Sequence, residues 1–251
     1  MSRYDLCMTR SMISIKNLSK SFGDNEVFNN IDLEVREGEL VCLIGFSGCG
    51  KSTLLKMIAG LEEPSSGTIE IDSSKLGMAF QYSALFDSMT VRDNIAFSLL
   101  VGEHIKNPPS EEEVNKRVAE KLNLVGLPGI ENQFPSELSG GMKKRVSFAR
   151  AIMNDPEIIL YDEPTAGLDP VASTIIEDII VKLQKETKSS GIIVTHQQST
   201  IKRASNRVVL LYDGGIAWQG TPKELFDEKN DNKFAKQFRS GSPEGPMLIK
   251  H

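Results

Sequence analysis

The chain has 251 residues, 39% of them hydrophobic and 25% charged, and 29 Lys and Arg against 34 Asp and Glu give a formal net charge of −5. Folded as one unit, a chain of this length buries roughly 75% of the surface that its unfolded form exposes, so it can build a core without disulfide or metal staples. The acidic balance argues against a protein whose main task is to hold nucleic acid, because neutralising phosphates needs a basic surplus. We therefore expect no nucleic-acid partner.

The cysteines and the apolar runs indicate the redox compartment of the chain and whether it spans a membrane. Cys7, Cys42 and Cys49 form no Cys-x-x-Cys pair and cannot build a disulfide framework, which suits a reducing cytosol. The best apolar run, 40–46, falls far short of the about 20 residues that a membrane crossing needs. Residues 1–10 lack the continuous apolar stretch of a signal peptide. Any membrane association is therefore expected to come through a partner.

The predicted elements alternate between strands and helices along the chain. Residues 12–18 and 31–36 alternate apolar and polar side chains with the two-residue period of half-exposed strands. Nearly uninterrupted apolar runs, typical of strands covered on both faces of a parallel sheet, occupy residues 40–44, 158–161, 192–195 and 208–212. Helical patterns lie between them at 51–59, 141–153 and 172–185. This order predicts an α/β fold with a parallel sheet and an antiparallel strand set at the N-terminus.

The stretch 83–136 has a different pattern. Helical periodicity at 91–100 and 111–125, a Pro108-Pro109 break and few strand signals predict a helical insertion on the α/β core. The last segment, 221–251, is polar with several Gly and Pro residues, which predicts a helix or two followed by an extended tail.

A glycine-rich window after the strand 40–44 carries the strongest chemical indication. Residues 45–53 fit the phosphate-binding pattern G-x-x-x-x-G-K-[ST] between a strand and a helix. Its glycines allow successive N–H groups to point at an anion, and the helix N-terminus adds partial positive charge. We expect Lys51 to reach the β- and γ-phosphates, Ser52 to bind Mg²⁺ and Thr53 to donate to phosphate. The expected ATP-binding residues here are Gly45, Phe46, Ser47, Gly48, Cys49, Gly50, Lys51, Ser52 and Thr53.

Two carboxylates follow the apolar strand 158–161. Because α/β sheets bind ligands at the carboxyl ends of their strands, Asp162 would hold Mg²⁺ there, directly or through water. Glu163 is then the candidate general base that orients water against the γ-phosphate, a role that typically contributes about 10²–10⁴-fold in rate. The simpler alternative is that both acids cap the helix that follows Pro164.

The window Leu138-Ser139-Gly140-Gly141-Met142, followed by a basic triplet and a helical run, resembles the signature motif of ABC transporters. Over about residues 12–220 the chain resembles the ATP-binding subunit of such a transporter, because five motifs fall in the family's order. These are the phosphate loop, Gln81, the signature, the acidic strand end and His196.

The resemblance implies a P-loop NTPase fold with a mixed-sheet core, an antiparallel β subdomain and an inserted α-helical subdomain. It implies one ATP-binding domain over residues 12–251. The expected parts are a RecA-like core over about 12–82 and 155–220, a helical subdomain over about 83–154 and a C-terminal extension over about 221–251.

The signature also implies a second copy. Ser139 and the amides of Gly140 and Gly141 open a helix and form a second anion site, which one chain cannot plausibly fold onto its own γ-phosphate. In the family the signature faces ATP held by a partner subunit, so the resemblance implies a homodimer that sandwiches two ATP molecules. Asp169 matches the D-loop that crosses this interface. We interpret the basic triplet 143–145 as a solvated helix face.

Three further residues match family positions. Gln81 matches the Q-loop glutamine, whose amide can touch Mg²⁺ and water and link the nucleotide to the helical insertion. Phe22 matches the aromatic that stacks on adenine, with a core phenylalanine as the alternative. His196 matches the switch histidine that contacts the γ-phosphate, although Gln197 stands where most members have Asp. The resemblance thus assigns catalysis to Glu163, His196 and Gln81, and Mg²⁺ binding to Ser52, Gln81 and Asp162.

Other positions resemble one branch of the family. Met142, where many members have Gln, and the tail 237–246 resemble the MlaF/MceG branch, the ATPases of Mce-type lipid transporters. Residues 77–86 and 194–201 look closer still to the plastid lipid-import ATPase and its cyanobacterial relatives. We expect no transit peptide before residue 12, which favours the bacterial, cyanobacterium-like version.

The branch implies three properties of the assembly. The expected partners are an MlaE-like membrane permease and a periplasmic Mce-domain protein, with the chain on the cytoplasmic face of the inner membrane. The tail is expected to reach the neighbouring ATPase subunit, and a disordered Gly- and Pro-rich terminus is the alternative.

Other functions are compatible with the motifs. The chain could be the ATPase of another ABC importer or exporter, or a cytosolic ABC ATPase such as the iron–sulfur assembly type. The interval from Lys51 to Ser139 leaves no room for the coiled coil of the DNA-repair type, and the presence of one cassette argues against the translation type. A nucleotide-binding regulator without turnover is disfavoured because Lys51, Asp162, Glu163 and Ser139 are all present.

Overall fold

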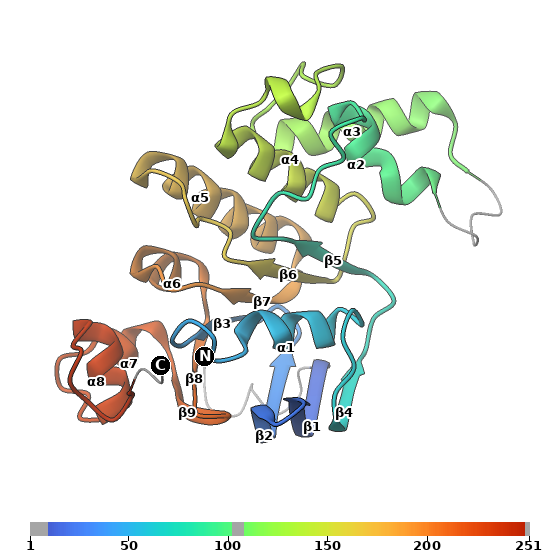
Figure 1. Cartoon of the computed structure of the whole chain (residues 1–251). Helices are drawn as coiled ribbons and strands as arrows, with labels where there is room; N and C mark the ends of the chain where they lie inside the picture. The colour runs from blue at the N-terminus through green and yellow to red at the C-terminus, as the bar shows by residue number, and fades with distance from the viewer. Residues whose placement is uncertain (1–9, 102–107, 249–251) are drawn as a thin grey trace.

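The computed structural model in Figure 1 describes residues 10–101 and 108–248. The expectations for residues 1–9 and for the end of the tail lie outside these ranges. Within them, no helix is both long and apolar enough to cross a bilayer.

A six-stranded sheet forms the centre of the molecule, in the order β5-β6-β7-β3-β8-β9. The first five strands run parallel and β9 is antiparallel to β8, which confirms the predicted mixed α/β fold. Every residue of β3, β6 and β7 is buried, as their apolar runs predict. The strands are β3 (Leu40–Ile44), β5 (Leu76–Ala79), β6 (Ile158–Asp162), β7 (Ser190–Val194), β8 (Arg207–Tyr212) and β9 (Gly215–Gly220).

A separate three-stranded antiparallel sheet has the order β2-β1-β4. Its strands β1 (Ser11–Phe22) and β2 (Asn25–Arg36) are longer than the sequence predicts, because register shifts let the ladder continue through polar residues. The third strand, β4 (Ser66–Ile71), was not predicted. Its residues are exposed or half-buried, so it lacks a strong apolar pattern.

The two faces of the central sheet pack against different elements. Successive residues of a strand point to opposite faces, so Val41 and Leu43 pack with α1 (Lys51–Ile58) and the antiparallel sheet, while Cys42 and Ile44 pack with helices on the other face. Those helices are α2 (Val91–Leu100), α3 (Glu111–Leu124), α4 (Gly140–Ala151), α5 (Pro170–Thr187), α6 (Gln198–Ala204), α7 (Pro222–Phe226) and α8 (Lys233–Ser240).

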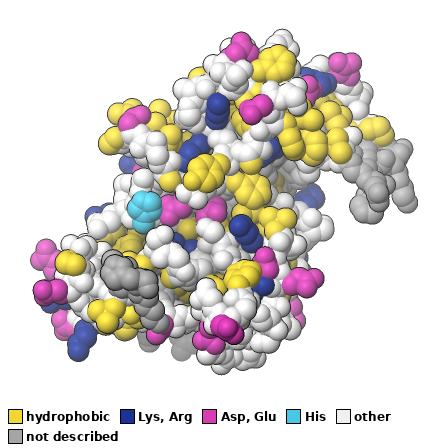
Figure 2. Space-filling view, in the orientation of Figure 1, with side chains coloured by type: hydrophobic (Ala, Val, Ile, Leu, Met, Phe, Trp, Pro, Cys, Tyr) yellow, Lys and Arg dark blue, Asp and Glu magenta, His cyan; other side chains and the backbone are white. Residues whose placement is uncertain are grey.

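The helices α2, α3 and α4 form the predicted insertion, drawn at the top of Figure 1. The helix α2 begins and ends where its periodicity predicts. Thr90 fixes its start by accepting a hydrogen bond from the N–H of Asp93 at 3.2 Å. Apolar side chains gather on the surface over α2 (Figure 2). Leu100, the last residue of this helix, and Phe86, which precedes it, are both exposed.

The tail after α8 packs against its own chain. The buried amide of Gln237 accepts a hydrogen bond from the N–H of Met247 at 2.8 Å and donates to the carbonyl of Met247 at 2.9 Å. The N–H of Leu248 donates to the hydroxyl of Tyr212 at 3.0 Å. The predicted helices and tail are therefore present, but residues 241–248 fold back onto α8 and β8 instead of extending away from them.

Candidate nucleotide-binding site

The loop 45–50 joins the buried strand β3 to α1 and requires glycine at two points. At Gly45 the backbone φ is +151° and an added Cβ would lie 2.5 Å from the carbonyl oxygen of Leu211. At Gly50 φ is +95° and a Cβ would lie 2.5 Å from the ring of Phe28. No other residue type fits both angle and space, so the sequence dictates a loop that curls over the start of α1.

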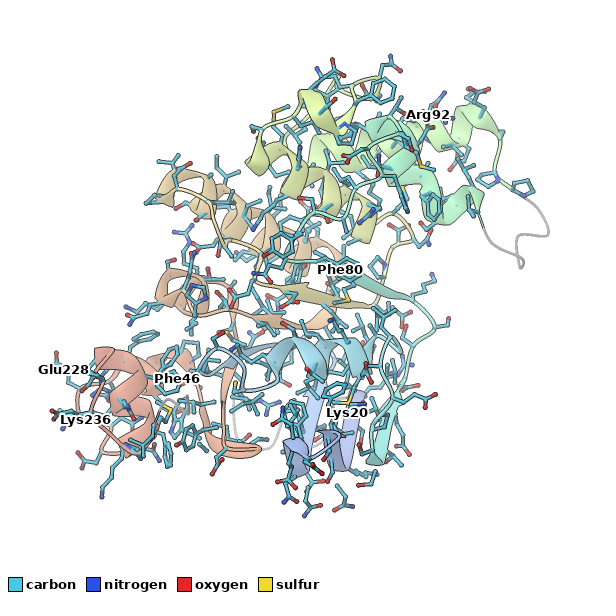
Figure 3. All side chains as sticks on the ribbon, in the orientation of Figure 1. Lys20, Phe46, Phe80, Arg92, Glu228 and Lys236 are labelled. Carbon is cyan, nitrogen blue, oxygen red and sulfur yellow. The ribbon has the colours of Figure 1, made fainter. Side chains whose placement is uncertain are left out.

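The ammonium of Lys51 lies inside this loop. Lys51 is 9% exposed, and its ammonium donates hydrogen bonds to the carbonyl oxygens of Gly45 at 2.9 Å and Phe46 at 2.8 Å. The side chain of Phe46 instead lies towards the C-terminal helices (Figure 3) and packs against the core that includes them, so only its backbone belongs to the loop. The loop thus presents one buried positive charge to any anion that its N–H groups bind.

A hydroxyl and a carboxylate meet at the carboxyl end of β6. Ser52 donates a hydrogen bond from Oγ to Oδ1 of Asp162 at 2.9 Å, and Asp162 as a residue is 7% exposed. Burial raises the pKa of Asp162, although the bond from Ser52 and the charges of Lys56 and Lys51 lower it. A buried carboxylate beside a hydroxyl suits Mg²⁺, which prefers oxygen ligands.

Asp162 and Ser52 offer two oxygen ligands for a metal ion. Among the described residues, no group of three or more His, Cys, Asp and Glu side chains is placed to bind a metal ion. Mg²⁺ usually takes one or two protein ligands together with water and substrate phosphates. The two oxygens therefore fit a metal that arrives with a nucleotide.

Glu163 has a backbone conformation that is rare for its residue type, with φ at +45°. Its N–H donates to the carbonyl of Val194 at 2.9 Å, and its carbonyl accepts from the N–H of Ala166 at 3.2 Å, so the surrounding turn holds this angle. Its Oε1 lies 3.0 Å from Nδ1 of His196. Its Oε2 is buried and has no hydrogen-bond partner within the described part of the chain. That free oxygen can accept a proton from water.

One cavity of about 650 Å³ brings most of the predicted residues together. Phe22 borders it and is 48% exposed, which argues against the alternative of a core phenylalanine, and the ammonium of Lys20 lies 4.4 Å from its ring centroid. The predicted residues that line the cavity are Phe22, Gly45, Ser47, Gly48, Gly50, Lys51, Ser52, Thr53, Gln81, Glu163 and His196.

The signature lies outside this cavity. Ser139 caps α4 by accepting a hydrogen bond from the N–H of Met142 at 3.3 Å. Gly140 borders a second hollow, of about 580 Å³, which Gln81 also borders. Asp169 caps α5, with Oδ1 accepting from the N–H groups of Val171 and Ala172 at 2.9 and 3.0 Å. Neither the signature residues nor Asp169 line the cavity of the phosphate loop.

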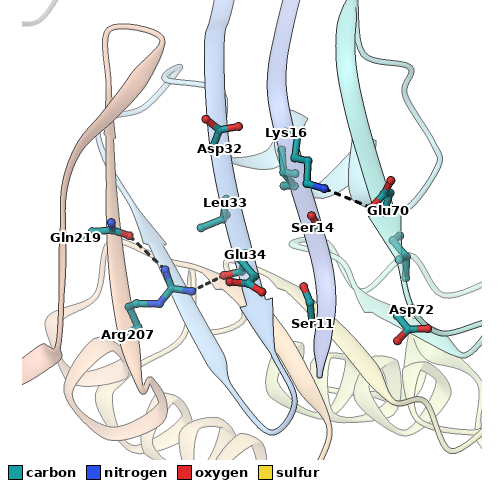
Figure 4. A pocket seen from close by; sticks show the side chains of 12 residues that line it. Ser11, Ser14, Lys16, Asp32, Leu33, Glu34, Glu70, Asp72, Arg207 and Gln219 are labelled. Atoms are coloured by element: carbon teal, nitrogen blue, oxygen red, sulfur yellow. Dashed lines mark hydrogen bonds and ion pairs between the residues drawn. The ribbon is translucent and has the colours of Figure 1, made fainter. Parts of the chain in front are cut away.

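A larger hollow, of about 950 Å³, lies over the antiparallel sheet (Figure 4). Polar side chains that pair with each other border it, such as Lys16 with Glu70 at 3.9 Å and Arg207 with Gln219 at 3.3 Å. None of the predicted site residues lines it, so its size indicates no nucleotide site.

The interpretation of 143–145 as a solvated face is wrong for Lys144. Its ammonium donates to the carbonyl oxygens of Ala166 at 2.6 Å and Glu163 at 3.4 Å, and burial lowers its pKa against the opposing charge of Glu163. Lys144 ties the signature helix to the turn that carries the candidate base. Lys144 lies four residues after Gly140 and therefore on the same face of α4. This spacing is the sequence feature that could have indicated that Lys144 faces the same side as the signature.

Comparison with known proteins places this geometry in a family. Residues 28–166, more than half of the chain, match the family described as ABC transporter. The chain belongs to the ABC transporter family. It is an ABC ATPase, with the P-loop fold that its motifs predict and the ATP-binding activity of that family.

Two curated relatives are similar to this ABC ATPase along most of its length. "Protein TRIGALACTOSYLDIACYLGLYCEROL 3, chloroplastic" of Arabidopsis thaliana is 41% identical, over 94% of this chain and 75% of that protein. The sulfate/thiosulfate import ATP-binding protein CysA of Pectobacterium atrosepticum is 39% identical, over 86% of this chain and 68% of that protein.

A solved structure has the same fold. It is the dimeric, post-hydrolysis state of the ATP-binding cassette MJ0796 bound to ADP and Pi. The TM-score is 0.76 at 31% identity, and the match covers 84% of this chain and 99% of that one.

Proposed function

We propose that this ABC ATPase powers an Mce-type lipid transporter, and that two copies enclose two ATP molecules between the phosphate loop of one and residues 138–142 of the other. One observation supports the proposed dimer. A Cβ on Gly140 would meet nothing within 4 Å, and a Cβ on Gly141 would meet only Ala172, at 4.0 Å. Because no contact within residues 10–101 and 108–248 requires these glycines, the space beside the N–H groups of α4 suits an anion on another copy.

The residues of the cavity would share the work of hydrolysis. Bound ATP and Mg²⁺ supply the reactive phosphoanhydride and a divalent charge. Lys51 and the loop amides would bind phosphates, Phe22 would stack on adenine, and the metal-binding set would be Ser52, Gln81 and Asp162. Glu163 would take the proton of water on Oε2 while His196 orients the carboxylate through Oε1.

The transport assignment rests on similarity. The relative whose name contains a galactolipid is the more identical of the two described above and spans more of this chain than the sulfate-import relative. The proposed partners are therefore an MlaE-like permease and an Mce-domain protein, with the ATPase on the cytoplasmic face of the plasma membrane. For this assembly we keep the expected division of the domain 12–251 into a RecA-like core, a helical subdomain and a C-terminal extension. Helices α2 to α4, in the helical subdomain, would lie nearest the permease.

The dimer is tested at Gly140 and Glu163 together. Gly140→Ala should leave the melting temperature unchanged or slightly higher, because alanine favours helices and the space is open, yet lower kcat at least about tenfold. Glu163→Gln should bind ATP without turnover and accumulate as a dimer in size-exclusion chromatography. If Gly140→Ala hydrolyses ATP like the parent, the composite site is wrong.

The lipid assignment is tested by isolating the complex from membranes in mild detergent through a tag on the full chain. Mass spectrometry should find a multispan permease and an Mce-domain protein. A soluble scaffold would favour the iron–sulfur assembly type, and a sulfate-type permease would favour another importer; either result contradicts lipid transport.

A further inference from the structure

A fully buried carboxylate lies outside the nucleotide cavity. Glu177, on α5, is 1% exposed, and its Oε1 accepts hydrogen bonds from the hydroxyls of Ser199 at 2.8 Å and Thr200 at 2.7 Å on α6. Its Oε2 lies 3.1 Å from Nε of Arg203, which also pairs with Asp178. The carboxylate therefore joins α5, which follows the turn that carries Glu163, to α6, which follows the turn that carries His196.

The hydrogen bonds continue from Glu177 towards Glu163. Thr200 lies 3.4 Å from Thr165, hydroxyl to hydroxyl, and both side chains are fully buried. A hydroxyl has one proton, and Thr200 gives its proton to Glu177, so Thr165 must donate to Thr200. The bonds thus run in one direction, from Thr165 through Thr200 to the carboxylate, and Thr165 is two residues beyond Glu163.

The same network reaches the histidine. Nε2 of Gln197 donates to the carbonyl oxygen of Thr165 at 3.3 Å, and Gln197 follows His196 directly. Gln197 is also the N-cap position of α6, but its side chain makes no capping bond. The start of this short helix is held instead by the bonds from Ser199 and Thr200 to Glu177.

A carboxylate is a costly way to fill a core position, because burial of a charge is unfavourable unless it is paired and hydrogen-bonded. On the same helix the core positions Ile176, Ile180 and Leu183 are apolar. In some proteins a buried polar group is retained because it fixes one arrangement of its neighbours, and a satisfied buried network makes a core more rigid.

We propose that Glu177 is a positioning residue for ATP hydrolysis. Through Thr200 and Thr165 it fixes the start of α6 relative to the turn after β6, and so keeps His196 3.0 Å from Glu163. It does not line the nucleotide cavity. The inference rests on the proposed roles of Glu163 and His196.

The first test compares Glu177→Gln with Asp178→Asn, which removes the exposed partner of the same arginine and leaves the network intact. Both are made in the full chain within its membrane complex. Glu177→Gln should lower kcat about tenfold or more and change KM for MgATP less than about twofold, because a small displacement of reacting groups slows chemistry more than binding. Asp178→Asn should match the parent in both.

The second test uses Thr200 and does not depend on the folding of a Glu177 variant. Thr200→Val should reproduce the loss of kcat, whereas Thr200→Ser, which keeps the hydroxyl, should restore it. A merely structural network would lower the melting temperature of Glu177→Gln and Thr200→Val with kcat unchanged, which overturns the inference.

Failure of the proposed function has a different signature. If Glu163→Gln hydrolyses ATP like the parent, the base assignment fails whatever Glu177 does. If Glu163→Gln is inactive while Glu177→Gln and Thr200→Val turn over normally, only the positioning role is refuted.

Discussion

Nδ1 of His196 lies 3.0 Å from Oε1 of Glu163, and the two residues follow neighbouring parallel strands. The register pairs Asp162 of β6 with Val194 of β7, so the sheet itself brings the carboxylate and the imidazole to the same edge. The pair leaves Oε2 of Glu163 buried and free among the described residues. One oxygen is oriented and the other is available for water.

Removal of the imidazole should therefore slow chemistry more than binding. His196→Ala is expected to lower kcat about 100-fold, within the range for loss of a group that orients a general base, while KM for MgATP changes little. His196→Gln keeps a side-chain hydrogen-bond donor and should retain more activity. Steady-state phosphate release measures both. Equal activity of the alanine variant and the parent would show that Glu163 needs no such partner.

Asp162 gives a prediction in which stability and activity move in opposite directions. Because burial raises its pKa above the ordinary 3.8, the folded state binds this proton more tightly than the unfolded state. Stability therefore falls as pH rises from 3.8 through the raised pKa, and the full cost is present at neutral pH.

Asp162→Asn removes that cost and still accepts the bond from Ser52. At pH 7, without metal or nucleotide, the variant should gain on the order of 1 kcal/mol, or about 2–4 °C in Tm, and lose Mg²⁺-dependent hydrolysis. Thermal unfolding at pH 7 and pH 4 measures the difference, which should shrink at the lower pH. A variant less stable than the parent at pH 7 would contradict the buried-charge argument.

Lys144 connects the signature helix to the turn that carries the candidate base, so its loss should affect turnover. Lys144→Met keeps the length of the stem but removes the bonds to the carbonyls of Ala166 and Glu163. We expect kcat to fall about tenfold with ATP binding retained. The neighbour variant Lys143→Met is the control, measured in the same phosphate-release assay. If both methionine variants behave alike, the connection has no part in hydrolysis.

How far the sequence predicts this molecule depends on whether local pattern or long-range contact decides a feature. Apolar runs and caps are local, so the strand 40–44 and the helix 91–100 are found at their predicted bounds. The strands β4 and β9 were missed because their residues are half-buried or exposed and show no strong apolar pattern. The partner of β4 is the distant strand β1, whereas β9 pairs with β8 directly before it.

The same distinction holds in the site. The phosphate loop is a contiguous motif and was predicted residue by residue. The contact of Lys144 with Ala166 spans 22 positions, and that of Glu177 with Thr200 spans 23. No periodicity in one sequence reports such pairs, since a buried charge on a helix looks like a solvated one until its partner is in place.

The folded-back tail provides the last prediction. Gln237 is 4% exposed, and its amide satisfies both backbone groups of Met247. Gln237→Ala would leave these groups without their partner, at a cost of about 2 kcal/mol, or roughly 4–8 °C in Tm for a chain of this size. Lys236→Ala, at an exposed position of the same helix, should change Tm by less than about 1 °C.

Thermal unfolding and amide hydrogen exchange of the full chain check this together. The amide of Met247 should exchange slowly in the parent and in Lys236→Ala, and fast in Gln237→Ala, because Gln237 accepts its hydrogen bond. Fast exchange in the parent would mean that residues 241–248 leave their own chain in solution. In that case the tail would be free to reach a neighbouring subunit, as the resemblance to the lipid-transporter branch implies.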